Sequence, residues 1–154
     1  MKMQPGSLVV GVGNLFRGDD AIGPVVADKI KRLKLPDVKV VVSNGDLTDL
    51  AFDFKKCELL IIIDSVSAGA SPGTIYRLFP LDEVNAIQME EKFSTHALGI
   101  KDCLKVLREI QMLPDRVIIY GIEGADFRIG KGLSSPVAAS LDRLSEEIIA
   151  ELRA

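Results

Sequence analysis

Three side chains of metal-binding type stand where loops are predicted to meet strands and helices. Asp20 lies near the start of the first predicted helix, and Asp64 directly follows the apolar run 59–63. His96 lies where another helix is predicted to begin. The carboxyl ends of parallel strands meet at one edge of an open α/β sheet, so we expect both carboxylates to reach one crevice there. One imidazole and two carboxylates, with positions left open for water or substrate, are typical of a catalytic divalent-metal site.

His96 is the only histidine of the chain, so any imidazole chemistry depends on it. Ser94 or Thr95 can cap the helix that follows, and the positive end of the helix dipole then favours the neutral imidazole that a metal requires. Each residue also has a structural interpretation when taken alone. These are a surface histidine, a turn-forming Asp64, and helix-capping carboxylates at Asp19 and Asp20. The combination favours the metal site.

Apolar strand patterns alternate with amphipathic helix patterns along the whole chain. This alternation predicts one domain over residues 1–154, a three-layer α/β/α sandwich with a mostly parallel central sheet of about five strands. The segment 74–79 is more mixed in character and is the candidate for an antiparallel edge strand. The other predicted strands are 8–12, 38–42, 59–63 and 117–122. The predicted helices are 22–33, 48–54, a helix that begins near His96 and has its apolar stripe at 100–107, and 136–152.

Composition excludes several classes of partner. The net charge is −3 and aromatic residues are only 5%, so the chain has neither a basic footprint nor stacking platforms for nucleic acid. Two cysteines are too few for a disulfide scaffold or a Cys-rich zinc site. The apolar run near the start is too short for a signal peptide or a membrane span. We therefore expect a cytoplasmic monomer without a membrane or nucleic-acid partner.

The glycine-rich loop after the first strand is not a nucleotide-binding loop. A dinucleotide fingerprint that begins at Gly11 requires its third glycine at the position of Phe16. Asp19 and Asp20 follow, where a pyrophosphate would be repelled. The glycine–lysine–serine/threonine pattern of a P-loop is also absent.

The ordered set of motifs resembles the hydrogenase maturation proteases, and the resemblance covers nearly the full length. It depends on an apolar strand followed by Asp64, on Thr95-His96, and on four short segments. These segments are GVGN at 11–14, GDDAIGP at 18–24, GIE at 121–123 and LS at 133–134. The chain departs from the family pattern in two places: Gly124 replaces a frequent proline, and residues 44–46 read NGD instead of GGT.

The resemblance implies an endopeptidase that removes the C-terminal extension of a nickel–iron hydrogenase large-subunit precursor after nickel insertion. It implies that Asp20, Asp64 and His96 bind a divalent metal, with Asp19 as a supporting residue or a base. Nickel is the expected metal, held by the enzyme or supplied by the substrate, and zinc or cadmium could substitute. The metal either activates the scissile peptide directly or docks the precursor for attack by water.

Two other functions fit parts of the sequence. A peptidyl-tRNA hydrolase-like enzyme has a similar architecture and first loop, although it requires a basic groove that the net charge of −3 disfavours. A metal-binding chaperone would hold the precursor without cleaving it.

Overall fold

The computed structural model describes residues 6–82 and 96–154, and it places their side chains except those of residues 96–99. Five strands form one sheet in the order β2-β1-β3-β5-β4, which confirms the predicted α/β class. β4 is antiparallel to β5 and the other neighbours are parallel, so the predicted antiparallel edge strand is also confirmed. The strands are β1 (Ser7–Val12), β2 (Val38–Ser43), β3 (Leu59–Val66), β4 (Ile75–Leu78) and β5 (Arg116–Glu123).

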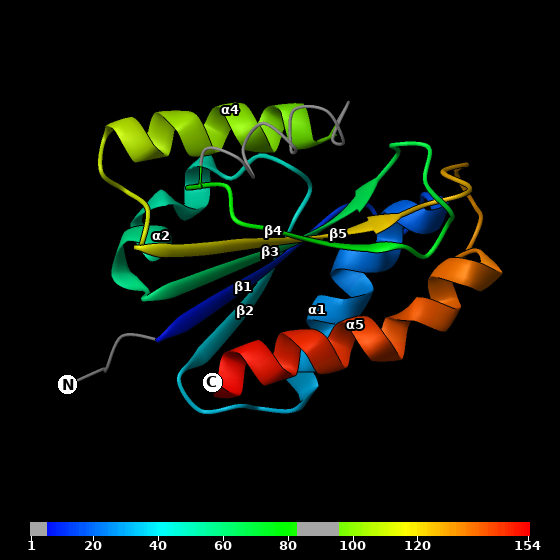
Figure 1. The fold of residues 1–154 in the computed structure, drawn as a ribbon, viewed down its shortest axis with the longest axis horizontal. Coiled ribbons are helices and arrows are strands. Elements are labelled where there is room, and N and C mark those ends of the chain that lie inside the picture. The colour runs from blue at the N-terminus through cyan, green and yellow to red at the C-terminus, as the bar shows by residue number, and fades with distance from the viewer. Residues whose placement is uncertain (1–5, 83–95) are drawn as a thin grey trace.

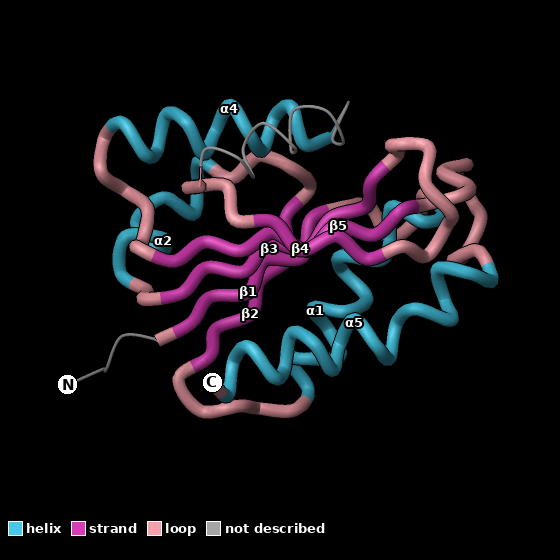
Figure 2. The backbone as a smooth tube through the Cα atoms, viewed as in Figure 1, coloured by secondary structure: helices cyan, strands magenta, loops and turns pink. Residues whose placement is uncertain are grey.

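Helices cover both faces of the sheet (Figures 1 and 2), as predicted for a three-layer sandwich. The first and last helices pack on one face, and the two middle helices pack on the other. They are α1 (Ile22–Arg32), α2 (Ala51–Lys56), α4 (His96–Glu109) and α5 (Ser135–Arg153). Two short 3-10 helices, η1 (Gly18–Ala21) and η2 (Thr48–Leu50), directly precede α1 and α2.

Alternate residues of the buried strands supply two separate cores. Leu60 and Ile62 of β3 pack with α2 and α4, whereas Ile61 and Ile63 pack with α1 and α5. Every residue of β3 is buried, which explains why its sequence is continuously apolar rather than alternating. Each fully buried aliphatic side chain stabilises the fold by about 1.5–3 kcal/mol, so β3 firmly fixes the polar residues that follow its apolar run.

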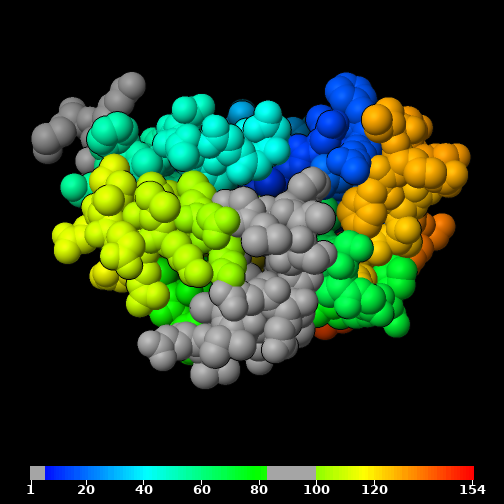
Figure 3. Space-filling view, turned by 90° about the horizontal axis from the view of Figure 1, so that it is seen from above, coloured from blue at the N-terminus to red at the C-terminus, as the bar shows by residue number. Residues whose placement is uncertain are grey.

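The carboxyl ends of β1, β3 and β5 lie at one edge of the sheet, on the right in Figure 1. The first loop, residues 13–17, leads from β1 into η1 and lies beside the segment 124–134, which connects β5 with α5. The Gly18 N–H donates to the Lys131 carbonyl at 3.0 Å, and the two segments adjoin at the surface (Figure 3). Two stretches that are more than 100 residues apart in sequence therefore form one rim at the carboxyl edge of the sheet.

Two of the differences from the predicted element boundaries affect residues at the carboxyl edge. β3 continues past Ile63 to Val66, so Asp64 lies inside the strand, opposite Gly121, because β5 extends the ladder alongside it. α5 begins at Ser135, one residue before the predicted start at 136, and its N-cap is Ser134. The hydroxyl of Ser134 makes no capping bond because it donates to Asp19 instead.

Candidate active site

Two buried carboxylates lie together at the carboxyl edge of the sheet. Asp20 comes from η1 and Asp64 from β3, and their exposed fractions are 2% and 0%. Ser65 connects them: its hydroxyl donates to Asp20 Oδ1 at 2.9 Å, and its N–H donates to Asp64 Oδ1 at 2.8 Å. The Asn14 N–H donates to Asp20 Oδ2 at 3.0 Å, so the first loop also orients this carboxylate.

Gly13 makes this placement of Asp20 possible. Its φ of +145° is a conformation that side-chain-bearing residues rarely adopt. A Cβ at this position would collide with the Asp20 carbonyl oxygen, so only glycine lets the backbone of η1 approach so closely. The Gly13 N–H donates to the Ser43 carbonyl at 2.9 Å, which ties the first loop to the end of β2.

The surroundings of Asp64 stabilise its charged form poorly. Burial raises the pKa of Asp64 well above its ordinary value, and the nearby charge of Asp20 raises it further. The hydrogen bond from the Ser65 N–H acts in the opposite direction and is the smallest of the three effects. Within the described part of the chain, Asp64 Oδ2 has no hydrogen-bond donor. A buried oxygen of this kind is suited to a proton or a cation.

The third predicted ligand, His96, begins α4, as the sequence predicts for a helix start. The N-terminal end of α4 is on the side of the carboxyl edge (Figure 1). The side chain of His96, and the proposed capping residues Ser94 and Thr95, lie outside the described residues. Among the side chains that the structure describes, no three acidic, cysteine or histidine groups gather as a metal site. The joining of His96 to the two carboxylates therefore stays a prediction.

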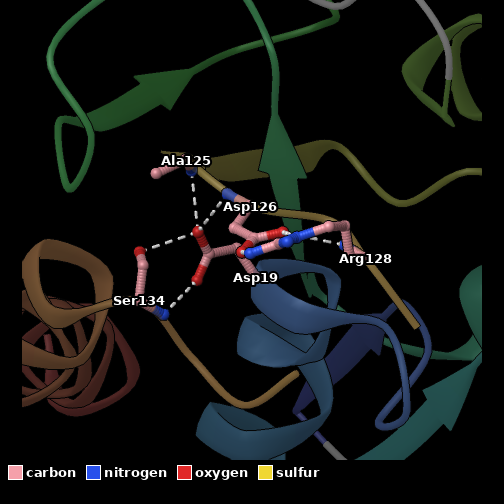
Figure 4. Close-up of polar contacts among 5 residues, drawn as sticks. All are labelled: Asp19, Ala125, Asp126, Arg128 and Ser134. Carbon is pink, nitrogen blue, oxygen red and sulfur yellow. Dashed lines mark hydrogen bonds and ion pairs between the residues drawn. The ribbon is translucent and has the colours of Figure 1, made fainter. Parts of the chain in front are cut away.

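The Asp19 carboxylate lies against the segment 124–134, where it accepts hydrogen bonds from both ends of that segment (Figure 4). Its Oδ2 accepts from the N–H groups of Ala125 and Asp126 and from the Ser134 hydroxyl, at 2.7, 3.0 and 2.8 Å. Its Oδ1 accepts from the Ser134 N–H at 2.7 Å. Burial by itself would raise the pKa of Asp19, but the hydrogen bonds outweigh it and hold that pKa below its ordinary value. This geometry suits a residue that positions the loop.

Glu123 is a further buried acid at this edge, and the sequence reasoning did not consider it as a separate site residue. Its carboxylate accepts from the Ala68 N–H at 3.1 and 3.0 Å and from the Ala70 N–H at 2.6 Å. It therefore holds the loop between β3 and β4 over the end of β5. The available signal was the one that revealed Asp64, an acidic residue at the end of a buried apolar run.

An open depression of about 480 Å³ lies between the first loop and the loop after β2. It includes residues 44 and 46, the two positions where the sequence departs from the family's GGT segment. Its lining residues are Gly13, Val42, Ser43, Asn44, Asp46, Asp49 and Leu50.

Comparison with known proteins identifies the family. The family model described as hydrogenase maturation protease matches residues 24–151. The chain belongs to this family. The hydrogenase 2 maturation protease of Escherichia coli is 33% identical over 149 residues, which cover 95% of this chain and 90% of that protein. Membership implies a peptidase whose substrate comes from a hydrogenase.

Solved structures of the family have the same fold. The hydrogenase maturating endopeptidase HybD from Escherichia coli superposes with a TM-score of 0.80 at 27% identity, covering 96% of this chain and 91% of that one. The nickel–iron hydrogenase maturation protease HybD from Thermococcus kodakarensis gives a TM-score of 0.77 at 25% identity, with 95% and 97% covered. Family membership favours the protease over the peptidyl-tRNA hydrolase-like alternative. Within residues 6–82 and 96–154, no helix is long and apolar enough to cross a membrane.

Proposed function

We propose that this protein removes the C-terminal extension of a nickel–iron hydrogenase large-subunit precursor after nickel has been inserted. Family membership supports the class of substrate and the peptide-bond chemistry. The observation that carries the proposal is the buried pair of Asp20 and Asp64 at the carboxyl edge, in which Asp64 Oδ2 lacks a donor among the described residues. We place the reaction in the cytoplasm and expect the enzyme to act as a monomer.

In this proposal Asp20, Asp64 and the His96 imidazole bind a divalent metal, and the metal is nickel. The carboxylate pair suits a cation because, with little water present, the negative charge of one carboxylate raises the free energy of the charge on the other. Three protein ligands are few for tight retention, so the precursor supplies its own nickel to the site. Zinc or cadmium could substitute in the same ligand set.

The chain's own residues have distinct tasks in this mechanism. A metal bound here supplies positive charge that polarises the scissile carbonyl or positions the peptide for attack by water. Asp64 Oδ2, which meets no hydrogen-bond donor among the described residues, is the atom that would accept a proton or contact a cation. Ser65 and the Asn14 N–H keep the Asp20 carboxylate in a single orientation before the substrate arrives. The buried position of both carboxylates keeps water from screening the site.

The direct test is cleavage of a nickel-loaded large-subunit precursor by the purified protein, followed by mass analysis. We expect loss of the C-terminal extension, and near-complete loss of activity in Asp20→Asn, Asp64→Asn and His96→Gln variants. Asp142→Asn is the matched control because the Asp142 side chain is 83% exposed and forms a surface ion pair with Lys29. Full activity in all three site variants would contradict the site assignment.

The same experiment separates cleavage from mere binding. Nickel-dependent complex formation without product would favour the chaperone alternative. The supply of nickel by the substrate is tested by equilibrium dialysis of the free protein against nickel. Tight binding by the free protein would show that the enzyme carries its own metal.

A further inference from the structure

Three large apolar side chains are exposed on the rim beside the carboxylate pair. Leu15 and Phe16 of the first loop are 58% and 76% exposed, and Ile129 of the segment 124–134 is 84% exposed. We call residues 15–17 and 127–131 the rim surface. Exposed aromatic and aliphatic side chains next to a reaction centre are typical of places where a protein partner binds.

Hydrogen bonds to backbone carbonyls hold the two halves of the rim surface together. The Gly130 N–H donates to the Phe16 carbonyl at 2.8 Å, and Arg17 Nε donates to the Phe127 carbonyl at 3.1 Å. In Figure 3 the first loop and the segment 124–134 form one continuous surface. The apolar side chains are thus carried by two loops that support each other, so little conformational entropy is lost when a partner binds.

Asp19 makes the rim surface rigid and places it near the site. Its carboxylate fixes both ends of the segment, through Ala125 and Asp126 at one end and Ser134 at the other. Asp20, the next residue in the chain, belongs to the carboxylate pair. A polypeptide bound on the rim surface therefore lies next to the proposed reaction centre.

The charge of the rim surface is opposite to that of the whole protein. Asp126 is paired with Arg128 at 2.7 Å, so these two charges neutralise each other. Arg17 and Lys131 leave the surface positive, in a chain whose net charge is −3. A positive border around exposed apolar side chains is complementary to an apolar segment with acidic neighbours.

We propose that the rim surface is the docking site for the large-subunit precursor and that it binds an apolar segment of the precursor flanked by acidic side chains. This inference rests on the proposed function, because the partner is the substrate of that same site. It assigns specificity to residues that contribute no group to the carboxylate pair, and it explains why Phe16 and Ile129 are left exposed.

The test is the steady-state cleavage of the nickel-loaded precursor by a Phe16→Ser/Ile129→Ser variant. We expect KM to rise by about tenfold, with kcat unchanged, because the variant removes contacts made equally in the ground state and the transition state. Phe52→Ser/Ile110→Ser is the matched control, since these side chains are 73% and 60% exposed on α2 and just after α4, away from the rim surface. A rim variant with the KM of the control would overturn the proposal.

The charge contribution is tested separately with Lys131→Glu, and with Lys55→Glu of α2 as its control. We expect the Lys131 variant to have a several-fold higher KM at low salt and a weaker dependence of KM on salt. If the wild-type enzyme neither binds nor cleaves the precursor, both the proposed function and the proposed docking site are ruled out. If the wild type cleaves the precursor normally and both rim variants have an unchanged KM, only the proposed docking site is ruled out.

Discussion

Asp19 and Asp64 are equally buried, at 0% exposure each, yet their surroundings have opposite effects. Asp19 accepts four hydrogen bonds from three residues, and its pKa is held below the ordinary value. Burial raises the pKa of Asp64 well above its ordinary value and the charge of Asp20 raises it further, while the one bond from the Ser65 N–H does not offset them. The two carboxylates lie at the same edge of the same sheet, so burial alone does not decide their behaviour.

The difference shows how the fold separates support from chemistry. Where backbone donors surround the carboxylate, its charge stabilises the loop that supplies those donors. Where a second carboxylate replaces the donors, the charge costs free energy and is available to an incoming proton or cation. Asp19 therefore belongs to the structure of the rim, and Asp64 belongs to the proposed reaction centre.

The largest expected effect is that of Asp64→Asn. We expect cleavage to fall by about a hundredfold or more, since the proposed reaction loses a charged group at its centre. Metal-free protein at neutral pH should nevertheless become more stable by about 1–2 kcal/mol, because the amide carries no charge to be buried. Cleavage assays and thermal unfolding in chelator measure the two effects. A lower unfolding temperature would contradict the assignment of Asp64 as a destabilising charge.

Asp19→Ala should have the opposite effect on stability. We expect it to lower the free energy of unfolding by about 2–3 kcal/mol, because buried donors of Ala125, Asp126 and Ser134 lose a charged acceptor. Denaturant unfolding gives the magnitude, with Asp142→Ala as the surface control. Hydrogen exchange should be faster at those three amides, and unchanged exchange there would show that Asp19 does not hold the segment 124–134.

The dependence of stability on pH distinguishes the two carboxylates again. Asp64 has a raised pKa in the fold, so metal-free wild type should lose stability as pH rises from about 4, by at most about 1.4 kcal/mol per pH unit. The Asp64→Asn variant should lack this loss. Asp19 has a lowered pKa, so the stability it contributes should be complete above pH 4 and fade in stronger acid. Denaturant titrations between pH 3 and 8 measure both, and parallel pH curves for wild type and Asp64→Asn would be the contrary result.

Ser65→Ala should have the smallest effect. The variant removes the hydroxyl that donates to Asp20 Oδ1 and leaves the backbone donor of Asp64 in place. We expect a loss of about 1 kcal/mol in stability and a several-fold loss of cleavage, because Asp20 becomes less well oriented. Ser140→Ala is a control, since this hydroxyl bonds only the Val137 carbonyl within its own helix. A loss of cleavage as large as that of Asp64→Asn would show that Ser65 has a more direct role.

Periodicity and strand ends were enough to predict most of the fold and the nearness of the two carboxylates. The continuous apolar run of β3 must be covered on both faces of the sheet. This requirement favours parallel neighbouring strands with helices on both sides. Once β1 and β3 are parallel neighbours, the residues that follow them share an edge. The roles of Asp20, Asp64 and His96 as metal ligands remain predictions.

Three features escaped the sequence because they depend on contacts between distant segments. The end of β3 depends on how far β5 accompanies it, so the sequence places Asp64 at the end of the strand although β3 continues to Val66. The anchoring of the β3–β4 loop by Glu123 depends on two amides more than 50 residues away in sequence. α5 begins one residue before the predicted start at 136, and the hydroxyl of its N-cap, Ser134, donates to Asp19 of a distant segment instead of capping the helix.

By itself the sequence determined the three-layer fold, the family motifs and the acidic character of the carboxyl edge. These depend on short-range patterns, namely hydrophobic period, glycines at tight turns and acids after apolar runs. Only the tertiary structure decided which of two adjacent acids supports the fold and which shares the proposed site. Asp19 and Asp20 are neighbours in sequence, but a carboxylate takes its properties from the donors and charges around it, and distant segments supply those.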